Sequence, residues 1–179
     1  MPDGSHKITN MKILATVVCF IVLQTASASA LIVGDDAPMF FLRDMEGNNF
    51  YLSNYVGPKK KENTKGVILA FFASWCKPCK NELPILNALV DELAGKGIKV
   101  VIIGMNEDFD TILKTLNDIK VDKPLILSDR YGKIAEKFGV RSLPKAFFIS
   151  CNGKICDVIP GEMEHFEIAV REKVGRHFK

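Results

Sequence analysis

The sequence predicts one α/β domain, in which helices flank a mixed central sheet and a β-hairpin is added at the N-terminal side. In the middle of the chain, short apolar runs that suit buried strands alternate with longer segments of helical period. Towards the C-terminus, two strand-like runs flank Asn152-Gly153, a strong hairpin signal, and a helical segment follows. A length of 179 residues with 47% hydrophobic residues suits a single domain with a full core.

Residues 1–30 indicate a targeting segment, so we place the domain at residues 31–179. Lys12 precedes the apolar run Ile13–Leu23, and alanines spaced as Ala-x-Ala follow it, which is typical of a secretory signal peptide. As a helix this run reaches roughly 17 Å, which is short of a hydrocarbon core of roughly 30 Å. We therefore expect a cleaved signal peptide and an exported protein; an uncleaved membrane anchor is the alternative.

The expected elements follow from these patterns in chain order. Before the central motif we expect a hairpin, a short helical turn and a solvated lysine-rich loop, at Met39–Asp44 with Asn49–Leu52, Ser53–Tyr55 and Pro58–Lys65. The later strands are expected at Val67–Phe72, Ile98–Met105, Pro124–Leu127, Ala146–Ile149 and Ile155–Ile159. The helices are expected at Pro78–Leu93, Asp110–Ile119, Tyr131–Phe138 and Glu162–Arg176.

The central motif is Cys76-Lys77-Pro78-Cys79, which follows the expected strand Val67–Phe72 and opens the next helix. The first cysteine then lies at a helix N-terminus, where unpaired N–H groups and the helix dipole favour an anion. We therefore expect the pKa of Cys76 to lie below the free value of about 8.5, and Lys77 adds a positive charge. Cys79 lies one helical turn on. Cys76 would attack a target disulfide, and Cys79 would resolve the mixed disulfide.

A zinc site is the alternative use of such a cysteine pair, but it needs two more Cys or His ligands at suitable spacing. The three histidines, His6, His165 and His177, lie far from the motif in sequence. We therefore expect redox chemistry, with no metal and no cofactor. A net charge of +3 gives no reason to expect nucleic acid as a partner.

Several motifs together resemble the TlpA/ResA branch of thioredoxin-fold proteins. They are Gly34-Asp35-x-Ala37-Pro38-x-Phe40-x-Leu42, the hairpin, Phe71-Phe72-Ala73-Ser74-Trp75 before the cysteines, Glu82-Leu83-Pro84, and Leu143-Pro144 before Phe147-Phe148-Ile149. The resemblance covers nearly all of residues 34–176 and implies a thioredoxin fold and a periplasmic thiol–disulfide oxidoreductase, usually a reductant. It also implies protein disulfides as substrates and a membrane thiol transporter as the electron donor. Some members keep the haem-attachment cysteines of cytochromes c reduced.

The resemblance also implies a substrate site. The Leu143–Pro144 bond would be cis and would lie beside the disulfide, whereas an ordinary turn proline is trans. Leu143 would then offer backbone groups to an extended substrate peptide by strand addition. Trp75, Lys77 and Pro78 would border the same site.

Two departures from the family concern the chemistry. Ala70 stands six residues before the first cysteine, where thioredoxin itself has a buried aspartate that accepts a proton. Lys145 follows the proline, where the branch often has a small polar residue. Strong oxidants of this fold resemble Cys-Pro-His-Cys, whose histidine hydrogen-bonds the thiolate. Lys77-Pro78 offers a charge but no such bond, so we expect a reductant or isomerase-like potential.

Glu82 lies three residues after Cys79, in line with Leu86 and Leu89 on the apolar stripe of the expected helix. Burial in that stripe should raise the pKa of its carboxyl group. We expect Glu82 to accept the proton of Cys79 during resolution, and a glutamate at this place also resembles the ResA-like members. The alternative is that Pro84 kinks the helix and turns Glu82 to solvent.

Cys151 and Cys156 form a second close pair. A two-residue Asn152-Gly153 turn would place Cys156 opposite Ile149 and Cys151 opposite Lys154, with the cysteine Cβ atoms about 7 Å apart on one sheet face. A disulfide needs about 4 Å. We therefore expect two free thiols; a strained disulfide, and a metal-binding or second redox role, are the alternatives.

Two other function classes share features with this chain. A periplasmic copper-handling protein would use Cys76 and Cys79 as soft thiolate ligands. The copper-delivery relatives of this fold, however, have Cys-x-x-x-Cys and a distant histidine. A peroxiredoxin shares the Gly-Asp-x-Ala-Pro opening but has a proline seven residues before its cysteine, where this chain has Leu69.

Overall fold

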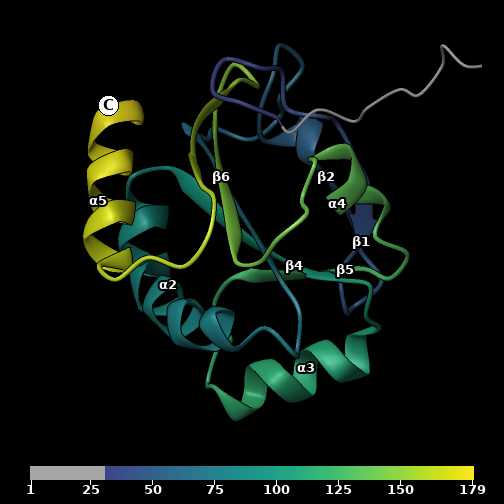
Figure 1. Ribbon diagram of the computed structural model, residues 1–179. Coiled ribbons are helices and arrows are strands. Elements are labelled where there is room, and N and C mark those ends of the chain that lie inside the picture. Colours follow the sequence, from purple (N-terminus) through teal and green to yellow (C-terminus); the bar gives the residue numbers. More distant parts are fainter. Residues whose placement is uncertain (1–30) are drawn as a thin grey trace, which may run out of the picture.

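The computed structural model describes residues 31–179, which form a five-stranded sheet with helices on both faces and a small two-stranded sheet beside it (Figure 1). The expected targeting segment, residues 1–30, lies outside the described residues. The strand order is β5-β4-β3-β6-β7. The bounds are β3 Gly66–Phe72, β4 Ile98–Met105, β5 Leu125–Asp129, β6 Lys145–Ser150 and β7 Ile155–Ile159.

Strand β3 is the centre of the sheet, and all seven of its residues are buried. It runs parallel to β4 and antiparallel to β6, so the sheet is mixed, as predicted. Because side chains alternate along a strand, Ala70 and Phe72 face one layer of the core, whereas Leu69 and Phe71 face the other.

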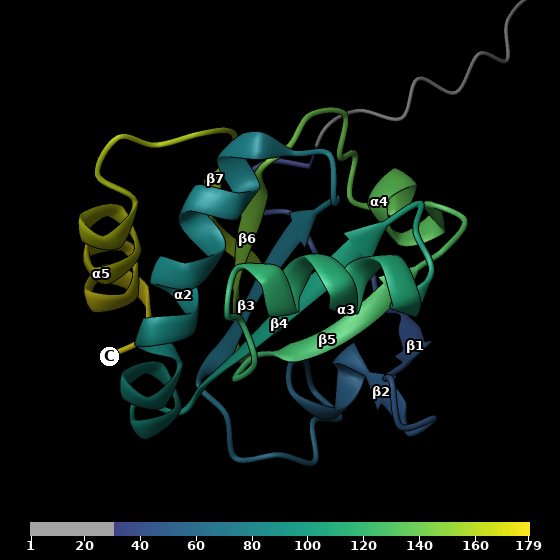
Figure 2. The ribbon, with the colours of Figure 1, turned by 90° about the horizontal axis from the view of Figure 1, so that it is seen from below.

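Different elements cover the two faces of the sheet (Figures 1 and 2). Helices α2 (Lys77–Gly95), α3 (Phe109–Asp118) and α5 (Phe166–His177) pack over the face of Ala70. Helix α4 (Lys133–Lys137) and the hairpin of β1 (Phe41–Arg43) and β2 (Asn49–Tyr51) pack over the face of Phe71, and the short helical turn Leu52–Asn54 follows that hairpin. None of the helices within residues 31–179 is long and apolar enough to cross a membrane.

Helix α4 begins at Lys133, later than the expected start at Tyr131. A side-chain cap from the end of strand β5 explains the difference. The buried carboxylate of Asp129 accepts the N–H groups of Ile134 and Ala135 at 2.9 and 2.8 Å. The residues between Asp129 and the helix are therefore used in a turn, and a carboxylate from the preceding strand satisfies the free N–H groups of the helix.

Helix α5 begins at Phe166, although the helical pattern indicates a start at Glu162. The residues before it form an irregular segment that reaches helix α2, where the Met163 N–H donates to Glu82 Oε1 at 2.8 Å. This contact holds the segment before Phe166 against helix α2, and α5 begins only after it.

The predicted register of the β6–β7 hairpin is wrong. The loop has three residues, Cys151–Gly153, and Gly153 has φ +87°, a left-handed conformation that glycine adopts readily. Ile149 consequently pairs with Ile155 rather than with Cys156. Cys156 is the additional residue at a bulge in the ladder.

Candidate active site

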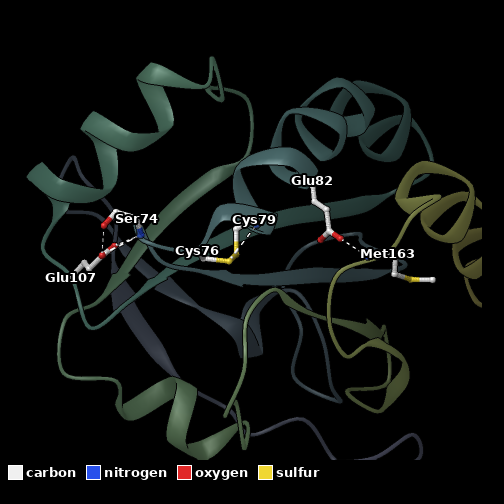
Figure 3. The surroundings of a disulfide bond; sticks show 6 residues. All are labelled: Ser74, Cys76, Cys79, Glu82, Glu107 and Met163. Carbon is white, nitrogen blue, oxygen red and sulfur yellow. Dashed lines mark hydrogen bonds between the residues drawn. A yellow bond between two sulfur atoms is a disulfide. The ribbon is translucent and has the colours of Figure 1, made fainter.

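The two cysteines of the central motif form a disulfide at the start of helix α2 (Figure 3). Cys76 is the N-cap residue with an extended backbone (φ −77°, ψ 98°), and Pro78 lies in the first turn, where its missing N–H costs no hydrogen bond. The Cα atoms of Cys76 and Cys79 are 5.4 Å apart, within the range of disulfides. The turn Ala73–Trp75 follows the end of β3 and places Cys76 at the edge of the sheet where that strand ends.

The helix N-terminus supplies a hydrogen-bond donor to the sulfur of Cys76. The Cys79 N–H donates to Cys76 Sγ at 3.2 Å, and such a donor favours the thiolate over the thiol. Cys76 and Cys79 are 3% and 1% exposed, so exposure does not tell a nucleophile from a resolving cysteine. The N-cap position, the N–H donor and the exposed neighbour Lys77 all favour Cys76 as the nucleophile.

The Leu143–Pro144 peptide bond is cis, as the resemblance implies. Pro144 is buried and, together with Cys79 and Glu82, lines a cavity of about 10 Å³, room for roughly one water molecule. Three of the predicted site residues thus meet at one small cavity. Leu143 is half-buried beside it, and Trp75 lies on the surface with 69% of its area exposed.

Glu82 is only 5% exposed although Pro84 lies within α2, so the alternative that it turns to solvent is wrong. Burial raises the pKa of the Glu82 carboxyl group; the hydrogen bond from the Met163 N–H opposes this rise, and the negative charge of Glu162 adds to it. Ala70 lines the same cavity. The acid at this place therefore comes from helix α2, next to the strand position where thioredoxin has its aspartate.

A second carboxylate contacts the active-site turn, and sequence reasoning missed it. Glu107 accepts the Ser74 N–H at 3.1 and 2.9 Å and the Ser74 O–H at 2.5 Å (Figure 3). Glu107 lies two residues after β4, the parallel neighbour of β3. The carboxyl ends of parallel strands meet at one edge, so this spacing was the available signal.

The other two cysteines within residues 31–179, Cys151 and Cys156, are free thiols, as predicted. Cys151 is exposed and follows β6, whereas Pro144 precedes that strand, so the two residues lie at opposite ends of it. The Cys156 thiol donates to the Phe148 carbonyl at 3.2 Å, and burial raises the pKa of Cys156 to about 11. Within residues 31–179, no group of three or more His, Cys, Asp or Glu side chains could hold a metal ion.

Comparisons with known proteins agree with this geometry. The model of the AhpC/TSA family matches residues 33–158. The chain is 33% identical over 140 residues to the thiol-disulfide oxidoreductase ResA of Geobacillus thermodenitrificans, covering 78% of this chain and 76% of the relative. It is 30% identical over 138 residues to ResA of Bacillus subtilis, covering 77% and 73%. Among solved structures, a putative thiol:disulfide interchange protein DsbE from Chlorobium tepidum has a TM-score of 0.73 at 27% identity, covering 84% of this chain and 100% of that chain.

Proposed function

Because this chain belongs to the AhpC/TSA family and is a thioredoxin-like thiol–disulfide oxidoreductase, we propose that it reduces disulfides in exported proteins through Cys76 and Cys79. The observation that carries the proposal is the buried carboxylate of Glu82, which shares a cavity with Cys79 and Pro144. A base at that place can accept the proton of the resolving cysteine. Resolution is the step that completes electron transfer from the protein to the substrate.

In the first step, the Cys76 thiolate attacks one sulfur of the substrate disulfide. A new S–S bond joins Cys76 to the substrate, and the second substrate sulfur leaves as a thiolate that takes a proton from water. The N–H of Cys79 and the N-terminus of α2 hold the negative charge on the attacking sulfur before the step.

In the second step, Glu82 accepts the proton of Cys79, and the Cys79 sulfur attacks Cys76 Sγ. The Cys76–Cys79 disulfide forms and the remaining substrate sulfur leaves as a thiolate, so two electrons have passed from the protein dithiol to the substrate disulfide. Burial raises the pKa of Glu82 above that of a free carboxyl group. The carboxylate is therefore a stronger base, which can take the proton here and return it when the protein is reduced again.

The substrate peptide would lie along Leu143 and pair with its backbone by strand addition. Trp75, Lys77 and Pro78 would then border the target cysteine. The proposed location is the periplasm, with a membrane thiol transporter as the electron donor, in keeping with the signal-like segment at residues 1–30. Cytochromes c awaiting haem attachment are the substrate class that the resemblance to ResA proposes.

The reduction potential of the purified protein, equilibrated with glutathione, tests the direction of electron flow. A reductant of this kind should have a potential more negative than about −180 mV, the value of protein disulfide isomerase. A potential near that of DsbA, about −120 mV, would mean that the protein oxidises its targets and would overturn the proposal.

A further inference from the structure

Glu107 holds the turn that leads into the nucleophile, and none of the chemical steps above uses it. Its two carboxylate oxygens accept the Ser74 N–H at 3.1 and 2.9 Å, and one of them also accepts the Ser74 O–H at 2.5 Å. In Figure 3 the carboxylate points at Ser74 on the side of the disulfide away from Glu82. Hydrogen bonds to a carboxylate are stronger than those between neutral groups, so the contact between Glu107 and Ser74 is a strong one.

The turn itself explains why this contact reaches the reactive sulfur. The Cys76 N–H donates to the Ala73 carbonyl at 3.0 Å, so Ser74 and Trp75 are the two middle residues of a turn that closes on Cys76. That closure uses no N–H of Ser74, and Glu107 supplies the partner. Trp75 is 69% exposed, so packing with the core does little to fix its place.

Glu107 is held in its turn by strand β5. Its backbone carbonyl accepts the Ser128 O–H at 2.7 Å, and the N–H of the preceding Asn106 donates to the Asp129 carbonyl at 2.9 Å. Asn106 has φ 60°, a left-handed conformation, and bends the chain at the end of β4. The contact at Ser74 therefore ties the active-site turn to a rigid neighbouring strand.

We propose that Glu107 is a positioning residue, which fixes Trp75 and Cys76 in the geometry of attack before a substrate arrives. It acts through Ser74 and takes no proton from either cysteine. Because the turn is already ordered, substrate binding does not have to order it. Loss of the Glu107 contact should therefore slow formation of the mixed disulfide. The proposal rests on the oxidoreductase activity and is independent of the role of Glu82, whose loss should fall on resolution.

The test uses the full chain and the fact that Trp75 is its single tryptophan. In reduced Glu107→Ala, Trp75 fluorescence anisotropy should fall, acrylamide quenching should rise, and the rate of mixed-disulfide formation should fall about tenfold. Glu107→Gln keeps an acceptor oxygen and should recover most of both signals. Ser74→Ala keeps the N–H and should show a smaller loss, and the double variant Ser74→Ala/Glu107→Ala should be no worse than Glu107→Ala alone.

Glu167→Ala is the matched control, because Glu167 is an exposed carboxylate on helix α5 that forms an ion pair with Arg171. It should change neither the fluorescence of Trp75 nor the rate. Unchanged anisotropy and an unchanged rate in Glu107→Ala would overturn the proposal. A lowered melting temperature with unchanged anisotropy would also overturn it, because Glu107 would then only stabilise the fold.

Discussion

The chain carries two close cysteine pairs, and they have opposite chemistry. Cys76 and Cys79 lie in one helical turn with Cα atoms 5.4 Å apart and form a disulfide. Cys151 and Cys156 lie on either side of a hairpin, one in an exposed loop and the other at a bulge, and both are free thiols. A short separation in sequence is therefore not enough for two cysteines to form a disulfide. A helix start brings two sulfurs onto one face, whereas the bulge shifts the register on which a cross-strand pair depends.

The two cysteine pairs also differ in the hydrogen bonds that their sulfur atoms make. The Cys76 sulfur accepts an N–H at a helix N-terminus, which favours the thiolate. The Cys156 thiol is a donor to a carbonyl, and burial raises its pKa to about 11, which favours the thiol. The hydrogen bond that Cys76 accepts supports its proposed role as the nucleophile, whereas burial of Cys156 and the hydrogen bond that it donates favour its thiol form.

The largest expected effect separates the two pairs by activity. Cys76→Ser should lose all measurable reduction of a protein disulfide, because Cys76 alone holds the N-cap position of α2 and is the proposed attacking sulfur. The double variant Cys151→Ser/Cys156→Ser should stay within about twofold of the parent in the same assay. Loss of activity in the double variant, with an unchanged melting curve, would show that the comparison is wrong.

The next effect concerns Cys79 and the buried carboxylate of Glu82, which line the same cavity. Glu82→Gln should slow resolution of a preformed mixed disulfide by about 10²–10⁴-fold, because the general base is removed while the shape of the side chain is kept. Stopped-flow measurement across pH 6–9 would check this. If Glu82→Gln and the parent resolve the mixed disulfide at equal rates at every pH, Cys79 loses its proton to water rather than to Glu82.

Alkylation should separate the cysteines within the second pair. With the pKa of Cys156 raised from 9.0 to about 11, its thiolate fraction at neutral pH is about 100-fold lower than that of an unshifted thiol. Iodoacetamide under native conditions should therefore label exposed Cys151 and leave Cys156 unmodified, as peptide mass mapping would reveal. Equal labelling of both cysteines would contradict the burial argument.

The smallest expected effect is on stability. Burial raises the pKa of Glu82 in the folded protein above its ordinary value of 4.5, so the folded state holds this proton to higher pH than the unfolded chain. Stability is therefore lost as pH rises through the folded pKa. Glu82→Gln should match the parent below about pH 4.5. Above the folded pKa it should melt at a higher temperature than the parent, because the parent then has to bury a charged carboxylate.

Local patterns predict most of the fold. The bounds of β4 and β7, Ile98–Met105 and Ile155–Ile159, agree to the residue with the prediction. For β4 the reason is its largely apolar run, which suits a strand buried in the sheet. The starts of α4 and α5 were predicted too early. The start of α4 follows a local cap by the Asp129 carboxylate, and the segment before α5 makes a distant contact with Glu82.

The candidate site was predictable where one motif carries it. The two cysteines, Glu82 and Pro144 stand in recognisable positions, and the structure brings Cys79, Glu82 and Pro144 to one cavity. Glu107 was missed because its partner Ser74 lies 33 residues earlier in the chain. The hairpin register around Cys156 was predicted wrongly for a related reason. The dipeptide Asn-Gly does not specify the loop length, and the left-handed conformation of Gly153 allows a loop of three residues.

Trapping the mixed disulfide tests the central claim, that the pair at the helix start exchanges disulfides, with Cys76 as the attacking sulfur. Reduced Cys79→Ser is mixed with a protein disulfide, the adduct is purified without reductant, and the joined peptides are identified by mass spectrometry. The adduct should be on Cys76 and should persist because the resolving sulfur is absent. An adduct on Cys151 or Cys156, or one that accumulates with Cys76→Ser instead, would contradict the account.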